Sequence, residues 1–202
     1  MKPDGPCIAM TFDDGPEGIH TPRLLDFAAQ RRIRLTFFVL GIKVAREPDI
    51  ARRIVAEGHE IGNHSWSHAN FTEISQETVR DELQKTDSAI LQKAGIKTRL
   101  MRPPYGSITE AQCAWIKKEF GYRIVSWNVD PRDWKDRDPE VVAHRILGDA
   151  RAGSIILCHD IHASTIDAMP GVFDHLLRRG FKFATVSELL DGHPGAFVKS
   201  VT

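Results

Sequence analysis

Short apolar runs alternate along this chain with longer segments in which apolar residues recur every three or four positions. The runs have the length of strands, and Leu35 to Val39, with its aromatic and β-branched residues, is typical of a buried one. We expect seven strands, over residues 7–10, 35–39, 60–63, 100–101, 123–127, 154–158 and 183–186. Near-continuous apolar strands separated by amphipathic segments indicate a parallel sheet covered by helices.

Residues that favour helix ends bound the segments between these runs. Thr21 followed by Pro22 predicts a helix start, and Gly95 and Gly121 predict helix ends. Helices are expected from residue 21 onward and over residues 48–57, 75–93, 109–120, 139–147 and 165–179. The inner side of the long helix over residues 75–93 is expected to carry Val79, Leu83, Ile90 and Leu91.

Repeated strand–helix alternation predicts an α/β fold with either an open doubly wound sheet or a closed barrel. The glycine patterns of Rossmann and P-loop nucleotide sites are absent from the sequence. We therefore expect a distorted (β/α) barrel of about seven parallel strands.

Length and charge narrow the possibilities further. A chain of 202 residues is long enough for one domain with a core and too short for two. We expect a single domain over residues 1–202, with its core within about 7–190. Lysine plus arginine equal aspartate plus glutamate at 27 each, so no basic footprint for nucleic-acid binding exists. No apolar stretch reaches the length needed to span a membrane.

Cysteine usage and the chain ends add little chemistry. Cys7, Cys113 and Cys158 are odd in number and widely spaced, which favours buried free thiols over a disulfide. The start, Met1 to Pro6, lacks the apolar core of a signal peptide, so the chain is either intracellular or a mature or trimmed form. Residues after about Gly192 are expected to form a frayed tail.

Polar clusters fall just after predicted strands, which is the informative feature of the pattern. They are Asp13-Asp14, His64 to His68, Arg102 to Tyr105, Asp130 to Trp134 and His159. In a parallel barrel the carboxyl ends of all strands share one rim, where such folds place active sites. Five clusters far apart in sequence are therefore expected to meet in space.

The histidine pair and the aspartate pair together predict a metal site. His64 and His68 are four residues apart, which places them on one side of a helical turn or of a strand. Asp13 and Asp14 repel each other unless a positive group lies beside them. Two histidines and one aspartate would leave a coordination position for water, and the other aspartate would accept a proton from that water. The spacing does not decide which aspartate does which, and the plain alternative is two loop histidines without a metal.

Five segments of the sequence resemble the five motifs of the NodB-type polysaccharide deacetylases, carbohydrate esterase family 4. They read TFDDGP from Thr11, HSWSH from His64, RPPY from Arg102, DPRDW from Asp130 and LCH from Leu157. They occur in the family's order, and the resemblance covers about residues 7–190. It implies a distorted (β/α) barrel, a glycan substrate with N-acetyl groups, and a secreted, periplasmic or cell-wall location.

The resemblance also implies roles for the acidic and basic residues. Asp13 corresponds to the general base, and Asp14, His64 and His68 correspond to the metal ligands. Arg102 corresponds to the charged partner that holds the base in place. Every position that carries chemistry matches the family pattern, which argues against a catalytically dead relative.

Further roles concern the leaving group and the pocket. The backbone N–H of Tyr105 is implied to stabilise the oxyanion. His159 is implied to protonate the leaving amine, with its pKa raised by Asp133. Trp134 and Leu157 are implied to form the walls of a small pocket for the acetyl methyl group.

Other interpretations of single residues stay open at this point. Arg102 is alternatively an ordinary surface ion pair, and Asp133 a turn cap with Asp130 in its role. His162 is the rival to His159 as the acid, and Trp66 either stacks on a sugar ring or packs in the protein. A thiol nucleophile at Cys158 is disfavoured because adjacent strand residues point to opposite faces.

The function expected from the sequence is a metal-dependent hydrolase that removes N-acetyl groups from amino-sugar polymers or oligomers, such as peptidoglycan or chitin. Two histidines and an aspartate suit Zn²⁺, with Co²⁺, Ni²⁺ and Mn²⁺ also open. The alternatives are an acetylxylan O-deacetylase, a glycan-binding module without catalysis, and an Fe(II) oxygenase. The α/β pattern contradicts the last, because such oxygenases typically use antiparallel folds. Neither the glycan nor the oligomeric state follows from the sequence.

Overall fold

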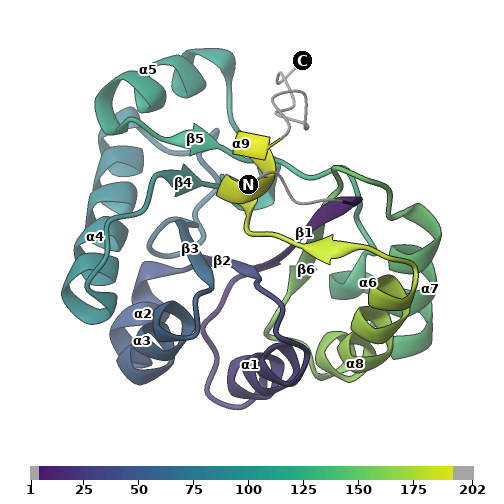
Figure 1. Ribbon diagram of the computed structural model, residues 1–202. Helices are drawn as coiled ribbons and strands as arrows, with labels where there is room; N and C mark the ends of the chain where they lie inside the picture. The colour runs from purple at the N-terminus through teal and green to yellow at the C-terminus, as the bar shows by residue number, and fades with distance from the viewer. Residues whose placement is uncertain (1–4, 193–202) are drawn as a thin grey trace.

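The computed structural model describes residues 5–192, and its strands form one parallel, strongly curved sheet (Figure 1). The strands are β1 (Cys7–Asp13), β2 (Thr36–Val39), β3 (Glu60–Asn63), β4 (Leu100–Met101), β5 (Arg123–Ile124), β6 (Ile155–His159) and β7 (Lys182–Phe183). Their order is β5-β4-β3-β2-β1-β6, and β7 also pairs with β1. The leading residues 1–4 and the expected tail after Gly192 lie outside the described residues.

A single bridge joins the two edges of this sheet. Val129, in the segment after β5, pairs in parallel with Ile156 of β6. The Leu157 N–H donates to the Val129 carbonyl, and the Asn128 N–H donates to the Ile155 carbonyl. The sheet therefore curls into a barrel that is closed over one short stretch. The predicted distorted barrel of parallel strands is confirmed.

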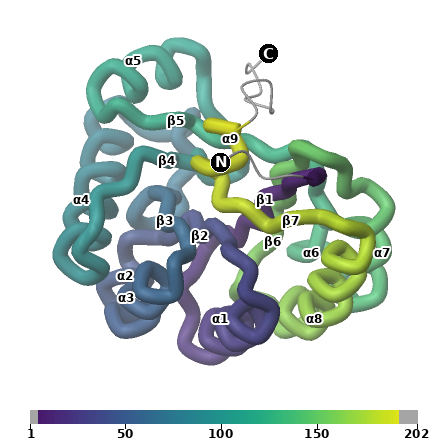
Figure 2. Tube along the Cα trace, in the orientation of Figure 1, coloured from purple at the N-terminus to yellow at the C-terminus, as the bar shows by residue number. Residues whose placement is uncertain are grey.

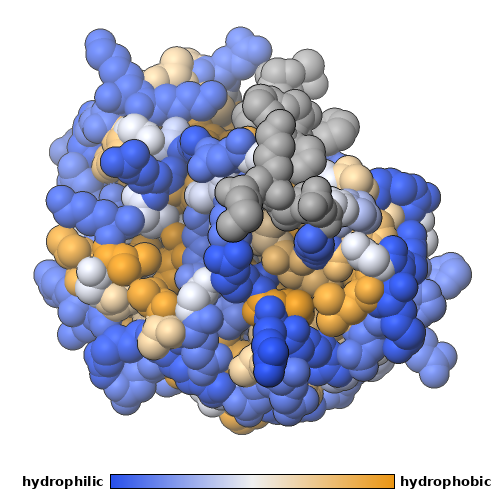
Figure 3. Space-filling model, viewed as in Figure 1, coloured by the Kyte–Doolittle hydropathy of each residue, from blue (hydrophilic) through white to orange (hydrophobic). Residues whose placement is uncertain are grey.

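Helices cover the strands, most of them around the outer face and the last of them across the centre of the view in Figure 2. They are α1 (His20–Arg31), α2 (Gly41–Arg46), α3 (Pro48–Ala56), α4 (Gln76–Ala94), the 3₁₀ turn η1 (Pro104–Gly106), α5 (Glu110–Phe120), α6 (Asp133–Asp136), α7 (Pro139–Asp149), α8 (Ala163–Arg178) and α9 (Val186–Gly192). Hydrophilic residues cover most of the visible outline in Figure 3, as expected for helices that bury one face. Over residues 5–192, none of the helices combines the length and the apolar character needed to cross a membrane.

Predicted helix signals hold for α4 and α5. Ser75 caps α4 by accepting the Thr78 N–H, and Gly95 follows the last turn as expected. Thr109 and Gln112 form a reciprocal capping box at the start of α5. The expected inner side of α4 is right for Val79, Leu83 and Ile90 and wrong for Leu91, which is 44% exposed.

Three other expectations about elements are wrong. The strand predicted over 123–127 ends at Ile124, because the next two carbonyls accept hydrogen bonds from Arg102. The strand predicted over 183–186 ends at Phe183, because Thr185 and Glu188 bond each other's backbone N–H groups and start α9. Helix α1 begins at His20 rather than being capped by Thr21.

Three hydrophobic clusters among the described residues occupy the two sides of the sheet. The largest, which includes Phe12, Phe37 and Phe173, packs the strands against the surrounding helices. A second, which includes Leu83, Met101 and Ile116, packs β4 and β5 against α4 and α5. A third, inside the barrel, includes Phe38, Leu100 and Val125. All three cysteines are free thiols as expected, although Cys113 is half-buried rather than buried.

Candidate functional site

Strand register brings the predicted polar clusters to one rim. Asp13 at the end of β1 pairs with His159 at the end of β6, and Asn63 at the end of β3 pairs with Met101 of β4. The residues that follow these strand ends line one cavity of about 470 Å³. The predicted site residues that line this cavity are Asp13, Asp14, His64, His68, Tyr105, Trp134, Leu157 and His159. Pro103, Gly106, Trp127, Asp130 and His162 complete the lining.

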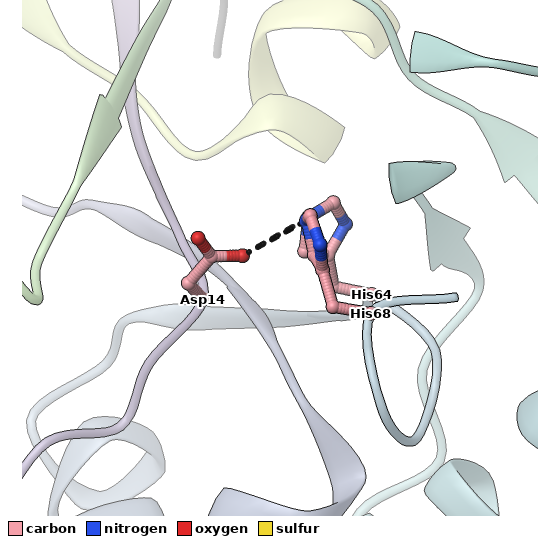
Figure 4. A group of neighbouring side chains, drawn as sticks. All are labelled: Asp14, His64 and His68. Atoms are coloured by element: carbon pink, nitrogen blue, oxygen red, sulfur yellow. Dashed lines mark ion pairs between the residues drawn. The ribbon is translucent and has the colours of Figure 1, made fainter. Parts of the chain in front are cut away.

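Asp14, His64 and His68 form a compact group of ligand atoms at the cavity floor (Figure 4). The Asp14 Oδ1 lies 3.4 Å from the His64 Nε2 and 3.3 Å from the His68 Nε2. This oxygen is buried and makes no hydrogen bond to any described residue. A buried oxygen without a donor is costly, so the arrangement suits a cation placed between the three side chains.

The two histidines lie on a loop rather than on the helical turn or strand that their spacing predicts. The chain after β3 takes left-handed backbone angles at Ser65 (φ 69°) and His68 (φ 66°). The Asn63 Oδ1 accepts the Ser65 N–H, and the Ser65 Oγ accepts the His68 N–H. These local bonds turn both imidazoles toward Asp14.

Hydrogen bonding sets the free nitrogen of His64. Its Nδ1 lies 2.7 Å from the Arg102 carbonyl, which has only lone pairs, so the ring donates there. The neutral ring then presents an unprotonated Nε2 to Asp14, the form in which imidazole binds a metal. One carboxylate oxygen and two imidazole nitrogens are a donor set that fits Zn²⁺.

Local charges favour the ligand forms of this group. Burial raises the pKa of the Asp14 carboxyl, but contact with His64 and the charge of His68 outweigh it and hold the pKa well below its usual range. Burial also lowers the pKa of His68 against the opposing charge of Asp14. An ionised carboxylate and a neutral imidazole are the states that bind a divalent cation.

Asp13 has a different partner from its neighbour Asp14. The Arg102 Nη1 donates to the Asp13 Oδ1 at 2.7 Å and to the Thr11 Oγ1 at 2.8 Å. The arginine is wholly buried, and its guanidinium lies 4.1 Å from the ring centroid of Phe38. The alternative of a surface ion pair is therefore wrong, and no sequence signal pointed to the Thr11 contact.

His159 is held by Asp133 and not by Asp130. The His159 Nδ1 lies 2.8 Å from the Asp133 Oδ1, and its backbone N–H donates to the Asp133 Oδ2 at 2.8 Å. The Thr165 hydroxyl, which no motif singled out, donates to the same Oδ2 at 2.7 Å. Asp130 instead accepts the backbone N–H of Arg132.

The imidazole of His159 therefore keeps its proton unusually well. Burial alone lowers its pKa, but the hydrogen bond and charge of Asp133 raise the pKa to about 9. The rival histidine, His162, also lines the cavity, and burial lowers its pKa. Within residues 5–192, His162 makes no ion pair with a carboxylate.

Aromatic and aliphatic side chains form the cavity walls. Tyr105 and Trp134 are 66% and 50% exposed at its rim, and Leu157 is buried within it. Tyr105 has a left-handed backbone (φ 60°), and its ring meets the His68 ring edge-on with centroids 4.4 Å apart. Trp66 is not part of this lining and packs against the hydrophobic core.

Comparison with known proteins agrees with the resemblance of the motifs. Residues 1–125 match the model of the polysaccharide deacetylase family. The chain belongs to this family. The match contains Asp13, Asp14, His64, His68 and Arg102.

Individual polysaccharide deacetylases extend the similarity beyond residue 125. The peptidoglycan-N-acetylglucosamine deacetylase PgdA of Listeria monocytogenes is 38% identical over 182 residues, covering 90% of this chain and 38% of the relative. The chitooligosaccharide deacetylase of a Bradyrhizobium species is 35% identical, and the alignment covers 90% of each chain. The structure of the peptidoglycan deacetylase PdaC from Bacillus subtilis has a TM-score of 0.91 at 35% identity, with 96% of this chain and 94% of that chain covered. This chain thus spans less than half the length of the first curated relatives that it matches.

Proposed function

We propose that this protein is a metal-dependent deacetylase that removes N-acetyl groups from an amino-sugar glycan, with residues 1–202 acting as one catalytic domain. The observation that carries the proposal is the buried Asp14 oxygen facing two imidazole nitrogens at 3.3 and 3.4 Å. Asp13 and His159 line the same cavity, and each is held from behind by a buried partner, Arg102 and Asp133 respectively.

Asp14, His64 and His68 are the residues that would hold the cation, which we propose to be Zn²⁺. Such a cation supplies a Lewis acid for the amide carbonyl and lowers the pKa of a bound water. Because Co²⁺, Ni²⁺ and Mn²⁺ accept similar donors, the identity of the metal is itself part of the test.

Asp13 would act as the general base. The Arg102 guanidinium fixes its Oδ1 by a charge-assisted hydrogen bond. Its Oδ2 makes no hydrogen bond within residues 5–192 and lies 3.7 Å from the His64 Nε2, beside the proposed metal site. This oxygen would accept a proton from a water that attacks the amide carbonyl.

His159 would act as the general acid. Its Nδ1 is bound to Asp133, so its other nitrogen, Nε2, carries the proton that the leaving amine takes when the C–N bond breaks. The products are acetate and the free amine on the sugar. The backbone N–H of Tyr105 would donate to the developing oxyanion, and Trp134 and Leu157 would enclose the acetyl methyl group.

Peptidoglycan is the substrate that we propose, and we expect the protein to act at a bacterial cell wall. The support is that the relatives PgdA and PdaC are peptidoglycan deacetylases, while the chitooligosaccharide deacetylase makes N-acetylglucosamine oligomers the second substrate to test.

The test is acetate release from peptidoglycan, N-acetylglucosamine oligomers and acetylxylan, with added Zn²⁺ or Co²⁺ and with a chelator. We expect metal-dependent release from the amino-sugar substrates, with peptidoglycan preferred. Release from acetylxylan alone would make the protein an O-deacetylase with the same site. A protein that binds metal and releases no acetate from any of the three would contradict the proposed activity.

A further inference from the structure

The loop that carries His64 and His68 is bonded on both sides by groups outside it. Its carbonyls face α2, where the Gly41 N–H donates to the Ser65 carbonyl at 3.0 Å and the Ile42 N–H donates to the Trp66 carbonyl at 3.2 Å. These donors are free because the first N–H groups of a helix have no partner within it.

Two N–H groups in the middle of the same loop donate to one carboxylate. The Glu82 Oε2 accepts the backbone N–H of Trp66 at 2.9 Å and that of Ser67 at 2.8 Å. The Glu82 Oε1 accepts the Ser67 hydroxyl at 2.9 Å. Glu82 belongs to α4, so a single side chain joins that helix to the middle of the loop.

Glu82 is buried, and its hydrogen bonds to the loop compensate the burial of its carboxylate. The residue is 9% exposed, and it makes no salt bridge with any described lysine or arginine. A buried carboxylate without a cation is costly unless its oxygens accept hydrogen bonds. Here the backbone of residues 66–67 supplies two of them.

Packing of Trp66 against α2 and α4 also holds the loop in position. Gly41 of α2 lies against both Trp66 and Thr86 of α4, because a Cβ at position 41 would come within 2.5 Å of both the indole and the Thr86 hydroxyl. The indole therefore fills the space that the missing side chain leaves. Hydrogen bonds and packing together fix residues 65–67, which separate the two histidines.

We propose that Glu82 is a positioning residue that holds His64 and His68 at the spacing required for metal binding. The inference rests on the proposed metal site. Glu82 touches neither the cation nor the substrate; it acts through the loop backbone. Groups that hydrogen-bond the ligands directly typically contribute about 10- to 100-fold to metal affinity, and Glu82 acts one bond further out, so an effect at the lower end of that range is expected.

The test measures Zn²⁺ affinity by competition with a chromophoric chelator, and the absorption spectrum of the Co²⁺-loaded protein. We expect Glu82→Ala to weaken the affinity about 10-fold and to change the Co²⁺ spectrum. Glu82→Gln keeps an oxygen for the two N–H groups, so it should stay within a few-fold of the parent protein. Glu77→Ala removes an exposed glutamate from the same helix and should change neither reading.

A purely structural role would lower the unfolding temperature of Glu82→Ala and leave the affinity and spectrum of the folded protein unchanged. That result would overturn the inference and keep the metal site. If Glu82→Ala does not fold, Glu82→Asp, which keeps the charge on a shorter side chain, must show the weakened affinity instead. A parent protein that binds neither ion would overturn the metal site and the inference together.

Discussion

Asp13 and Asp14 are neighbours in the chain, yet their carboxylates have separate partners. Asp13 is the last residue of β1 and bonds Arg102, while Asp14 has a left-handed backbone (φ 72°) and faces the two histidines. The change of backbone conformation from Asp13 to Asp14 points the two carboxylates in different directions. Spacing alone could not assign the two roles, because the assignment depends on which carboxylate the arginine reaches.

Asp13→Asn removes the proposed proton acceptor and keeps the shape of the side chain. We expect acetate release to fall by about 10²- to 10⁴-fold, the range for loss of a general base, while Zn²⁺ still binds with the parent stoichiometry. Turnover and bound metal should be measured on the same preparation. Asp149→Asn, at an exposed position, is the matched control. Parent-like turnover in Asp13→Asn would remove Asp13 from the mechanism.

The His159–Asp133 pair predicts an alkaline limit to activity. Because the pKa of His159 is raised to about 9, its protonated form and the activity should be lost as the pH rises through that value. The folded pKa exceeds the ordinary 6.5, so the contribution of His159 protonation to stability is complete below pH 6.5 and disappears as the pH rises through about 9.

Rate–pH profiles of the parent protein and Asp133→Asn would check this limit. Without the carboxylate, burial lowers the pKa of His159, and the alkaline limb should move to lower pH. Asp130→Asn should leave the limb where it is, since Asp130 bonds Arg132 and not His159. Identical limbs in Asp133→Asn and the parent would rule out this pair as its origin.

At the scale of elements, the apolar runs located the strands well, because buried parallel strands are apolar on both faces. Because the strands are parallel, their carboxyl ends share one rim, and the five motifs lie there. What the pattern could not predict depends on contacts between distant segments. Thr165 and Glu82 are ordinary helix residues until the fold brings them to Asp133 and to the histidine loop. The spacing of Thr185 and Glu188 is that of a capping box, but the apolar residues around Thr185 favoured a strand there instead.

The turn between β1 and α1 tolerates no side chain at Gly15. A Cβ there would lie 2.4 Å from both carboxylate oxygens of Asp160, which is wholly buried and accepts the Thr21 hydroxyl. We expect Gly15→Ala to displace Asp14 and to lower both stability and Zn²⁺ affinity. Thermal unfolding of the metal-free protein and a Zn²⁺ titration measure the two effects.

Gly148→Ala is the control for this substitution. Position 148 lies in α7, and a methyl group added there would meet no neighbouring atom within 4 Å, so alanine should stabilise the helix by up to about 1 kcal/mol. If Gly15→Ala has the unfolding temperature and the Zn²⁺ affinity of the parent protein, the close approach of Asp160 does not constrain the turn.

For the molecule as a whole, a bound cation would link the loops after β1 and β3. Ligands that bind only the folded state stabilise it by about 2.7 kcal/mol at 100 times the dissociation constant. For a chain of 202 residues this corresponds to a rise of about 5–10 °C in unfolding temperature. Chelator should reverse the rise. His68→Ala should abolish it, and His144→Ala, at an exposed histidine, should keep it. A rise of equal size in His68→Ala would place the cation elsewhere.

The three thiols of the fold have a consequence for where the site can work. Cys158 neighbours His159, but it points into the core, and burial raises its pKa well above the usual range. The proposed ligands are a carboxylate and two imidazoles, which peroxide and disulfide exchange do not attack as they attack thiolates. Among the described residues, no disulfide links the cysteines and no thiolate lines the cavity. The same site should therefore operate equally in reducing and in oxidising surroundings.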